Sequence, residues 1–121
     1  MAKNLALVIE DDEDLSEIFT KALEQAGFEV ETIRDGRAAQ QRLKQEVIPN
    51  VIALDLHLPH VDGSTLLKQI HADERFAKTR IILTTADAAQ AEFLREQATI
   101  VLIKPIAFTQ LRDISARLKM G

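Results

Sequence analysis

Short apolar runs alternate along this chain with longer segments in which hydrophobic residues recur every three or four positions. The runs at 5–9, 51–54, 81–83 and 100–103 are continuously apolar, which is typical of strands buried on both faces. The segment 28–33 alternates apolar with polar residues, and this pattern predicts a half-exposed strand at a sheet edge. The chain is therefore expected to form five strands.

Between these strands, the spacing of hydrophobic residues predicts helices. Residues 15–26 carry an apolar stripe that Gly27 is placed to end, and Asp35 is placed to cap a second helix that continues to about Glu46. Further stripes cover residues 66–70, 87 to about 97, and 108–118. Strands and helices that alternate in this way imply a doubly wound α/β fold, in which a parallel sheet carries helices on both faces.

Polar side chains follow four of the predicted strands. Glu10 and Asp11 follow the first, Asp55 the third, Thr84 and Thr85 the fourth, and Lys104 the fifth. The carboxyl ends of parallel strands meet at one edge of a sheet, and ligands bind there at the point where the strand order reverses. We therefore expect these side chains to share one crevice.

The acids in such a crevice need compensation. Two unit charges about 4 Å apart repel each other by roughly 4 kcal/mol at an effective dielectric of 20. A hard divalent cation is the simplest remedy, and Mg²⁺ takes oxygen ligands of this kind. With a hydroxyl and an ammonium group added, the site suits a phosphoryl group, and an aspartate that attacks phosphorus forms a covalent aspartyl phosphate.

Composition narrows the class of protein. Hydrophobic residues make up 46% of the 121 residues, and no repeat, linker or low-complexity segment divides them, so we expect a single domain over residues 1–121. The net charge of -4 argues against direct electrostatic binding of nucleic acid. Cysteine is absent, and no stretch approaches membrane-spanning length, so we expect a cytoplasmic protein without membrane contact.

Four short motifs lead from this chemistry to a family. They are Leu-Val-Ile-Glu-Asp-Asp at 7–12, Leu-Asp-Leu-His-Leu-Pro-His-Val-Asp-Gly at 54–63, Leu-Thr-Thr-Ala at 83–86, and Lys-Pro at 104–105. Each motif is weak alone, but all of them in this order, each after an apolar run, are highly specific. The chain resembles the receiver domains of two-component response regulators, including chemotaxis regulators, over essentially its whole length. The resemblance implies a flavodoxin-like fold, with a parallel sheet of strand order 2-1-3-4-5 flanked by five helices.

The resemblance also implies a role for each strand-end residue. Asp55 would accept a phosphoryl group from a histidine kinase or a histidine phosphotransfer protein. The Mg²⁺ ligands would be Glu10, Asp11, Asp55 and the backbone carbonyl of His57. Thr85 would be the switch hydroxyl and Lys104 the phosphate-binding lysine.

The resemblance has further consequences for the backbone, the activity and the partners of the chain. The peptide bond between Lys104 and Pro105 would be cis, as in most of the family. No enzymatic activity is implied beyond Mg²⁺-dependent self-phosphorylation and autodephosphorylation. The output domain or downstream protein stays open, as does a homodimer.

Some features depart from the family pattern. Val101 stands where most receivers have a switch aromatic, the segment 85–104 is shorter by about one helical turn, and Gln97-Ala98 replaces the usual Gly-Ala. All of these lie on the face through which many receivers dimerise or bind outputs. We expect intact phosphorylation chemistry, read out without the inward swing of an aromatic ring. The side chains of His57 and Asp87 flank the phosphate position and are expected to tune the lifetime of the phosphoryl group.

Simpler explanations exist for single residues. The acids at 10–14 could be a solvated block at a helix start, where the helix dipole favours negative charge. A lone Asp55 could cap a turn, and a lone Lys104 could be a surface residue. The spacing of His57 and His60 invites a zinc site, although no third ligand is evident. Phe93 could pack inward or offer a binding surface.

Other functions compete with a phosphoryl-accepting switch. A phosphohydrolase with an aspartyl nucleophile tends to carry a second aspartate two residues later, where this chain has His57. A pure interaction module would lack the acceptor, the acid pair or the lysine, and the sequence has all of these. A flavin-binding domain is disfavoured because the loops after the first and third strands are acidic where a flavin phosphate would sit.

Overall fold

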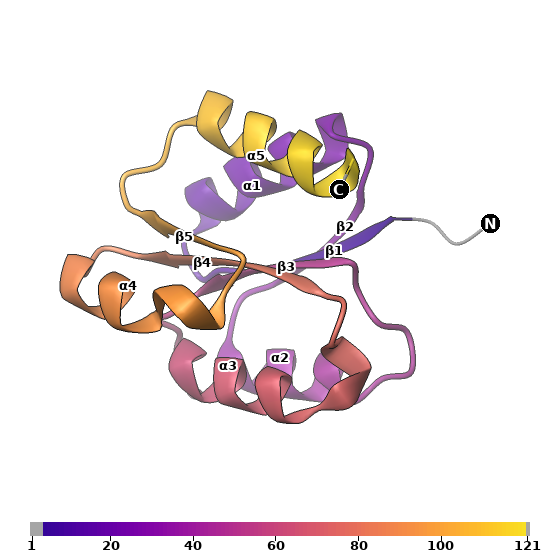
Figure 1. Ribbon diagram of the computed structural model, residues 1–121, viewed down its shortest axis with the longest axis vertical. Coiled ribbons are helices and arrows are strands. Elements are labelled where there is room, and N and C mark those ends of the chain that lie inside the picture. Colours follow the sequence, from indigo (N-terminus) through magenta and orange to yellow (C-terminus); the bar gives the residue numbers. More distant parts are fainter. Residues whose placement is uncertain (1–3, 121) are drawn as a thin grey trace.

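The computed structural model describes residues 4–120, and it contains a five-stranded sheet surrounded by helices (Figure 1). The strands are β1 (Leu5–Ile9), β2 (Glu29–Ile33), β3 (Val51–Asp55), β4 (Arg80–Thr85) and β5 (Ile100–Ile103). The helices are α1 (Glu13–Gln25), α2 (Gly36–Leu43), α3 (Gly63–Ala72), α4 (Ala88–Leu94) and α5 (Phe108–Met120). Short 3₁₀ helices follow α3 and α4, at Glu74–Phe76 and Arg95–Gln97.

The sheet has the predicted topology. Its strands are all parallel and lie in the order β2-β1-β3-β4-β5, which confirms the doubly wound, flavodoxin-like fold. Figure 1 shows α1 and α5 on one face of the sheet and α2, α3 and α4 on the other. Because the strand order reverses next to β1, the carboxyl ends of β1 and β3 border the crevice where ligands bind in such sheets.

Burial on both faces explains the continuous apolar runs. Along β1, Leu7 and Ile9 join the core cluster beneath α2 and α3, whereas Ala6 and Val8 join the cluster beneath α1 and α5. Full burial of a Val, Leu or Ile side chain contributes about 1.5–3 kcal/mol to folding. The predicted edge strand, β2, does lie at the sheet edge. Val30 and Ile33 are half-buried, and the other residues of β2 are exposed.

Local capping groups fix the ends of α1. Asp12 precedes the helix, and its Oδ1 accepts a hydrogen bond from the Leu15 N–H at 3.0 Å. At the other end Gly27 has a φ of 100°, a left-handed conformation that glycine adopts without strain. The Phe28 N–H then donates to the Leu23 carbonyl at 3.0 Å, so this helix ends where the sequence predicts.

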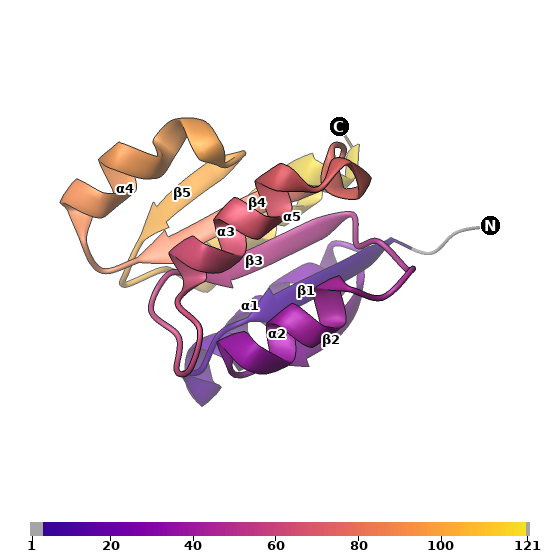
Figure 2. The same ribbon diagram turned by 90° about the horizontal axis from the view of Figure 1, so that it is seen from below.

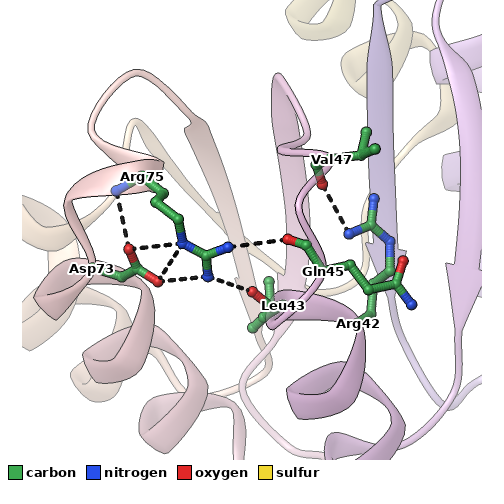
Figure 3. A network of polar contacts seen from close by, with 6 residues as sticks. All are labelled: Arg42, Leu43, Gln45, Val47, Asp73 and Arg75. Atoms are coloured by element: carbon green, nitrogen blue, oxygen red, sulfur yellow. Dashed lines mark hydrogen bonds and ion pairs between the residues drawn. The ribbon is translucent and has the colours of Figure 1, made fainter.

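The second helix ends earlier than the sequence predicts, at Leu43 rather than near residue 46. Arg75 donates to the carbonyl oxygens of Leu43 and Gln45, at 2.8 and 3.0 Å, and Arg42 donates to that of Val47 at 3.0 Å (Figure 3). These carbonyl groups find partners in side chains, so the backbone turns toward β3 without continuing the helix. The predicted end was wrong because Arg75 lies 30 residues from Gln45 in the sequence.

The fourth helix is short, as expected, and has seven residues. Only Ala91 and Leu94 are buried within it, and it packs against β4 and β5. Figure 2 shows it at the β5 side of the sheet, apart from α2. Within residues 4–120, no helix is long and apolar enough to cross a membrane.

Candidate functional site

The ends of β1 and β3 bring two buried acids together. The strands pair with Ile9 opposite Leu54, so Glu10 and Asp55 emerge from neighbouring strand ends, and both side chains are only 2% exposed. Lys104 reaches them from the end of β5. Its Nζ lies 3.2 Å from Glu10 Oε1 and 3.3 Å from Asp55 Oδ2. In this carboxyl-edge cluster, one ammonium group therefore faces two carboxylates.

The surplus of acid changes the protonation of Glu10. Burial raises the pKa of this carboxyl from 4.5 to about 8, and a hydrogen bond and the charge of Asp55 act in the same direction. The Asp12 N–H and the Lys104 ammonium oppose this rise without cancelling it. For Lys104, burial alone would lower the pKa, but Glu10 and Asp55 together raise it above its ordinary value. The cluster thus favours additional positive charge.

Asp11 completes a set of oxygen ligands. The carboxylates of Glu10, Asp11 and Asp55 offer oxygen atoms that all lie within 4.8 Å of one another. Apart from the Lys104 ammonium, the buried Oε1 of Glu10 has no hydrogen-bond donor among the residues that the structure describes. A buried oxygen in this condition, next to two other carboxylates, fits a hard divalent cation such as Mg²⁺.

The backbone after β3 is packed closely around Asp55. The His57 N–H donates to Asp55 Oδ1 at 3.0 Å, so the backbone at His57 lies beside the carboxylate. A Cβ at Gly63 would lie 2.2 Å from the Asp55 carbonyl oxygen, which only glycine avoids. In the sequence, Gly63 stands out only as the last residue of the motif at 54–63. The zinc alternative gains no support, because His57 and His60 belong to no group of three metal-ligating side chains within residues 4–120.

Thr85 is fully buried at the end of β4. Asp55 pairs with Thr84 in the sheet, and Thr85 follows at the same edge. The Thr85 carbonyl accepts a hydrogen bond from the Lys104 N–H at 2.8 Å, which ties the two predicted phosphate-binding residues together through the backbone. The peptide bond between Lys104 and Pro105 is cis, as the family resemblance implied.

The Thr85 hydroxyl contacts residues outside the strands. It accepts from the Asp87 N–H at 3.1 Å, donates to Gln90 Oε1 at 3.4 Å, and lies 3.5 Å from His57 Nε2. The Asp87 side chain caps α4, since its Oδ1 accepts from the Ala89 N–H at 3.0 Å. Gln90 was not among the predicted site residues, because a single glutamine near the start of an alanine-rich helix carries no pattern that points to a site.

The residues expected to mark an unusual output face are also placed. Val101 pairs with Leu83 in the sheet, and it is partly buried against the core cluster that includes Leu94. Phe93 is 82% exposed on α4, so the prediction that it could pack inward is wrong.

Comparison with known proteins agrees with this geometry. The response regulator receiver domain family matches residues 6–116. The probable methanogenesis regulatory protein FilR2 of Methanothrix harundinacea is 30% identical, and the match covers 95% of this chain and 81% of FilR2. The phosphate regulon transcriptional regulatory protein PhoB of Rhizobium meliloti is 36% identical, over 86% of this chain but only 47% of PhoB.

A solved structure extends the comparison to three dimensions. The receiver domain of the sensor histidine kinase PA1611 from Pseudomonas aeruginosa has a TM-score of 0.80 and 27% identity, over 99% of this chain and all of that domain. That structure holds a magnesium ion coordinated in its active site cleft. Sequence match, strand order and acidic strand ends lead to one conclusion: the chain belongs to the receiver domain family of two-component response regulators.

Proposed function

We propose that Asp55 accepts a phosphoryl group from the phosphohistidine of a histidine kinase or a histidine phosphotransfer protein. The observation that carries this proposal is the buried Asp55 carboxylate, which lies 3.3 Å from the Lys104 ammonium and beside the carboxylates of Glu10 and Asp11. A structural ion pair needs no additional acids around it. A phosphoacceptor that works with a divalent cation needs them as ligands.

The proposed transfer uses each member of the site. An Asp55 carboxylate oxygen forms a bond to phosphorus while the phosphorus–nitrogen bond of the donor breaks, and the electron pair of that bond stays on the imidazole nitrogen. Lys104 and the Thr85 hydroxyl are assigned to the phosphoryl oxygens. Glu10, Asp11, Asp55 and the His57 carbonyl would hold Mg²⁺, which would neutralise part of the charge on the transferring group.

The proposed output lies outside this chain. PhoB, for example, is a transcriptional regulator about half of which the chain spans. The net charge of -4 supports placing any nucleic-acid binding in another domain or protein. We assign the chain to the cytoplasm, with self-phosphorylation and autodephosphorylation as its only chemistry. A separate domain, a downstream protein or a homodimer would carry the signal onward.

We also propose that the output face is atypical. Val101 has no aromatic ring to swing inward, and it already packs against the core. The phosphorylated state is therefore read through other contacts of Thr85. A structure with a phosphoryl mimic should show Thr85 moved toward Asp55 without rearrangement around Val101, and strong phosphorylation-driven dimerisation through the α4–β5–α5 face would contradict this part of the proposal.

Intact mass spectrometry tests the phosphoacceptor directly. The protein is incubated with Mg²⁺ and a small acyl phosphate, and a labile phosphoryl adduct is expected for the wild-type chain but not for Asp55→Asn. Asp62→Asn is a matched control, because it removes an exposed carboxylate from the loop that follows β3 and should leave the adduct unchanged. Absence of an adduct with both the acyl phosphate and a phosphorylated kinase would overturn the proposal. Rapid multiple turnover of phosphate esters would identify a phosphohydrolase instead.

A further inference from the structure

The Thr85 hydroxyl distributes its hydrogen bonds unequally. A hydroxyl has one proton to donate and two lone pairs that accept. Oγ1 accepts from the Asp87 N–H at 3.1 Å and donates to Gln90 Oε1 at 3.4 Å, and with the His57 proton on Nε2 it accepts a second hydrogen bond from there at 3.5 Å. In this arrangement Gln90 receives the only proton that Thr85 can donate.

A phosphoryl oxygen on Asp55 would need the same proton. It is an acceptor, so it does not compete with the Asp87 N–H, but it does compete with Gln90 Oε1. A separation of 3.4 Å exceeds the usual O–H···O distance of about 2.7–2.8 Å, so the bond to Gln90 is weak. A charged phosphoryl oxygen is the stronger acceptor, so the Thr85 hydroxyl should donate to it once the weak hydrogen bond to Gln90 is broken.

Gln90 connects the Thr85 hydroxyl to the first turn of α4. Its own N–H donates to Asp87 Oδ1 at 3.1 Å, so Asp87 and Gln90 are linked and both contact the Thr85 hydroxyl. Beyond these contacts, α4 depends on the buried residues Ala91 and Leu94 and lies at the β5 side of the sheet (Figure 2). A change at Thr85 therefore reaches the first turn of this helix directly.

We propose that Gln90 is a positioning residue: it holds the Thr85 hydroxyl in the unphosphorylated protein and reports to α4 when that hydroxyl turns to a phosphoryl group. This inference rests on the proposed phosphorylation of Asp55. It places the readout at the start of α4 and not at position 101 on β5.

The rate of adduct formation with acyl phosphate and Mg²⁺ tests the role of Gln90. Gln90→Ala frees the hydroxyl proton and should form the adduct about 2- to 5-fold faster, the factor that corresponds to about 0.5–1 kcal/mol for one hydrogen bond. Gln90→Glu offers a charged acceptor and should be slower than the wild-type chain. Glu92→Ala is the matched control on the same helix, because its side chain is exposed and pairs with Arg95, and its rate should not change.

The same substitutions in a Thr85→Ala background separate positioning from other effects. Without the hydroxyl, Gln90→Ala should no longer change the rate, and whatever slowing remains in Gln90→Glu measures its added charge alone. Amide hydrogen exchange gives a second readout: phosphorylation should change the protection of residues 88–91 in the wild-type chain, but little in Gln90→Ala. A wild-type chain that forms no adduct refutes the proposed function. A normal adduct with equal rates in all Gln90 variants, or with a Gln90→Ala effect that persists in Thr85→Ala, refutes only the role of Gln90.

Discussion

Charged side chains gather at both edges of the sheet, and the two clusters are built differently. In the carboxyl-edge cluster, the single ammonium of Lys104 faces the carboxylates of Glu10 and Asp55, and both acids are buried. The fold provides Glu10 Oε1 with no other donor within the described residues. Negative charge is in excess at a buried site, so burial and charge repulsion both disfavour the ionised form of Glu10.

At the opposite edge, Arg75 and Asp73 form an amino-edge cluster between the ends of α2 and α3. Their closest ion-pair contact is 2.7 Å, and both side chains are partly exposed. Figure 3 shows the same guanidinium reaching the carbonyl oxygens of Leu43 and Gln45. Here the charges balance, and the nitrogen atoms of the guanidinium all have acceptors.

The two clusters shift acid pKa values in opposite directions. Hydrogen bonds from Arg75 lower the pKa of the Asp73 carboxyl, whereas burial and the neighbouring Asp55 raise that of Glu10. The charges of the amino-edge cluster therefore stabilise the folded protein. The excess negative charge of the carboxyl-edge cluster opposes folding unless a proton or a cation is added. Proteins keep such a destabilising group of charges where it serves a function, and perturbed pKa values cluster at functional sites for the same reason.

Among single substitutions, the largest effect is expected from removing the Lys104 ammonium from the carboxyl-edge cluster. Lys104→Met leaves the carboxylates of Glu10 and Asp55 without compensation, and the free energy of unfolding at pH 8 without divalent cations should fall by up to about 3 kcal/mol. Urea unfolding measures this loss. Lys21→Met removes an exposed lysine that pairs with Glu17 and should change little. Equal losses in the two variants would show that Lys104 does not offset repulsion between the carboxylates of Glu10 and Asp55.

The raised pKa of Glu10 should also make the stability depend on pH. Because the pKa of Glu10 is raised to about 8 in the folded protein, the folded state binds more protons than the unfolded state between about pH 4.5 and 8. The free energy of unfolding should therefore fall as the pH rises through this window, with a loss of several degrees in Tm. Glu10→Gln should flatten the profile.

Adding or removing a divalent cation should affect the carboxyl-edge cluster most. Mg²⁺ should raise the Tm most at the alkaline end of that window, since there it replaces the missing positive charge and binds only the folded state. Chelation with EDTA should restore the original profile. A Tm that does not respond to Mg²⁺ at any pH would contradict the assignment of Glu10, Asp11 and Asp55 as a cation site.

The smallest effect is expected at the amino edge. Arg75→Lys keeps the charge but loses the forked contacts to the Leu43 and Gln45 carbonyls, so the Tm should fall by less than in Lys104→Met. Because Arg75 lowers the pKa of Asp73, its contribution is present above the ordinary pKa of this carboxyl and is lost as the pH falls. Thermal unfolding should thus show a wild-type advantage near neutral pH that shrinks in acid. An advantage that grows in acid would overturn this account.

Several features of the fold were predictable because their causes lie within a few residues. The apolar runs of β1, β3 and β4 indicate strands buried on both faces, and Gly27 ends α1 where its left-handed φ is needed. The acids and the lysine of the carboxyl-edge cluster could also be found, because each directly follows an apolar run and parallel strand ends share one edge. The family motifs then gave the strand order, which local patterns do not specify.

Tertiary structure alone decided where contacts span the chain. The end of α2 depends on Arg75, the need for glycine at position 63 depends on the Asp55 carbonyl, and the significance of Gln90 depends on the Thr85 hydroxyl. Phe93 is exposed although it is aromatic, because α4 lies at the side of the sheet and turns only Ala91 and Leu94 inward. Local sequence was enough to specify the strands, the capped ends of α1 and the chemistry of the strand ends, since periodicity and capping involve near neighbours. The balance of charge and the partner of each polar group came only from folding, which brings distant residues within hydrogen-bonding distance.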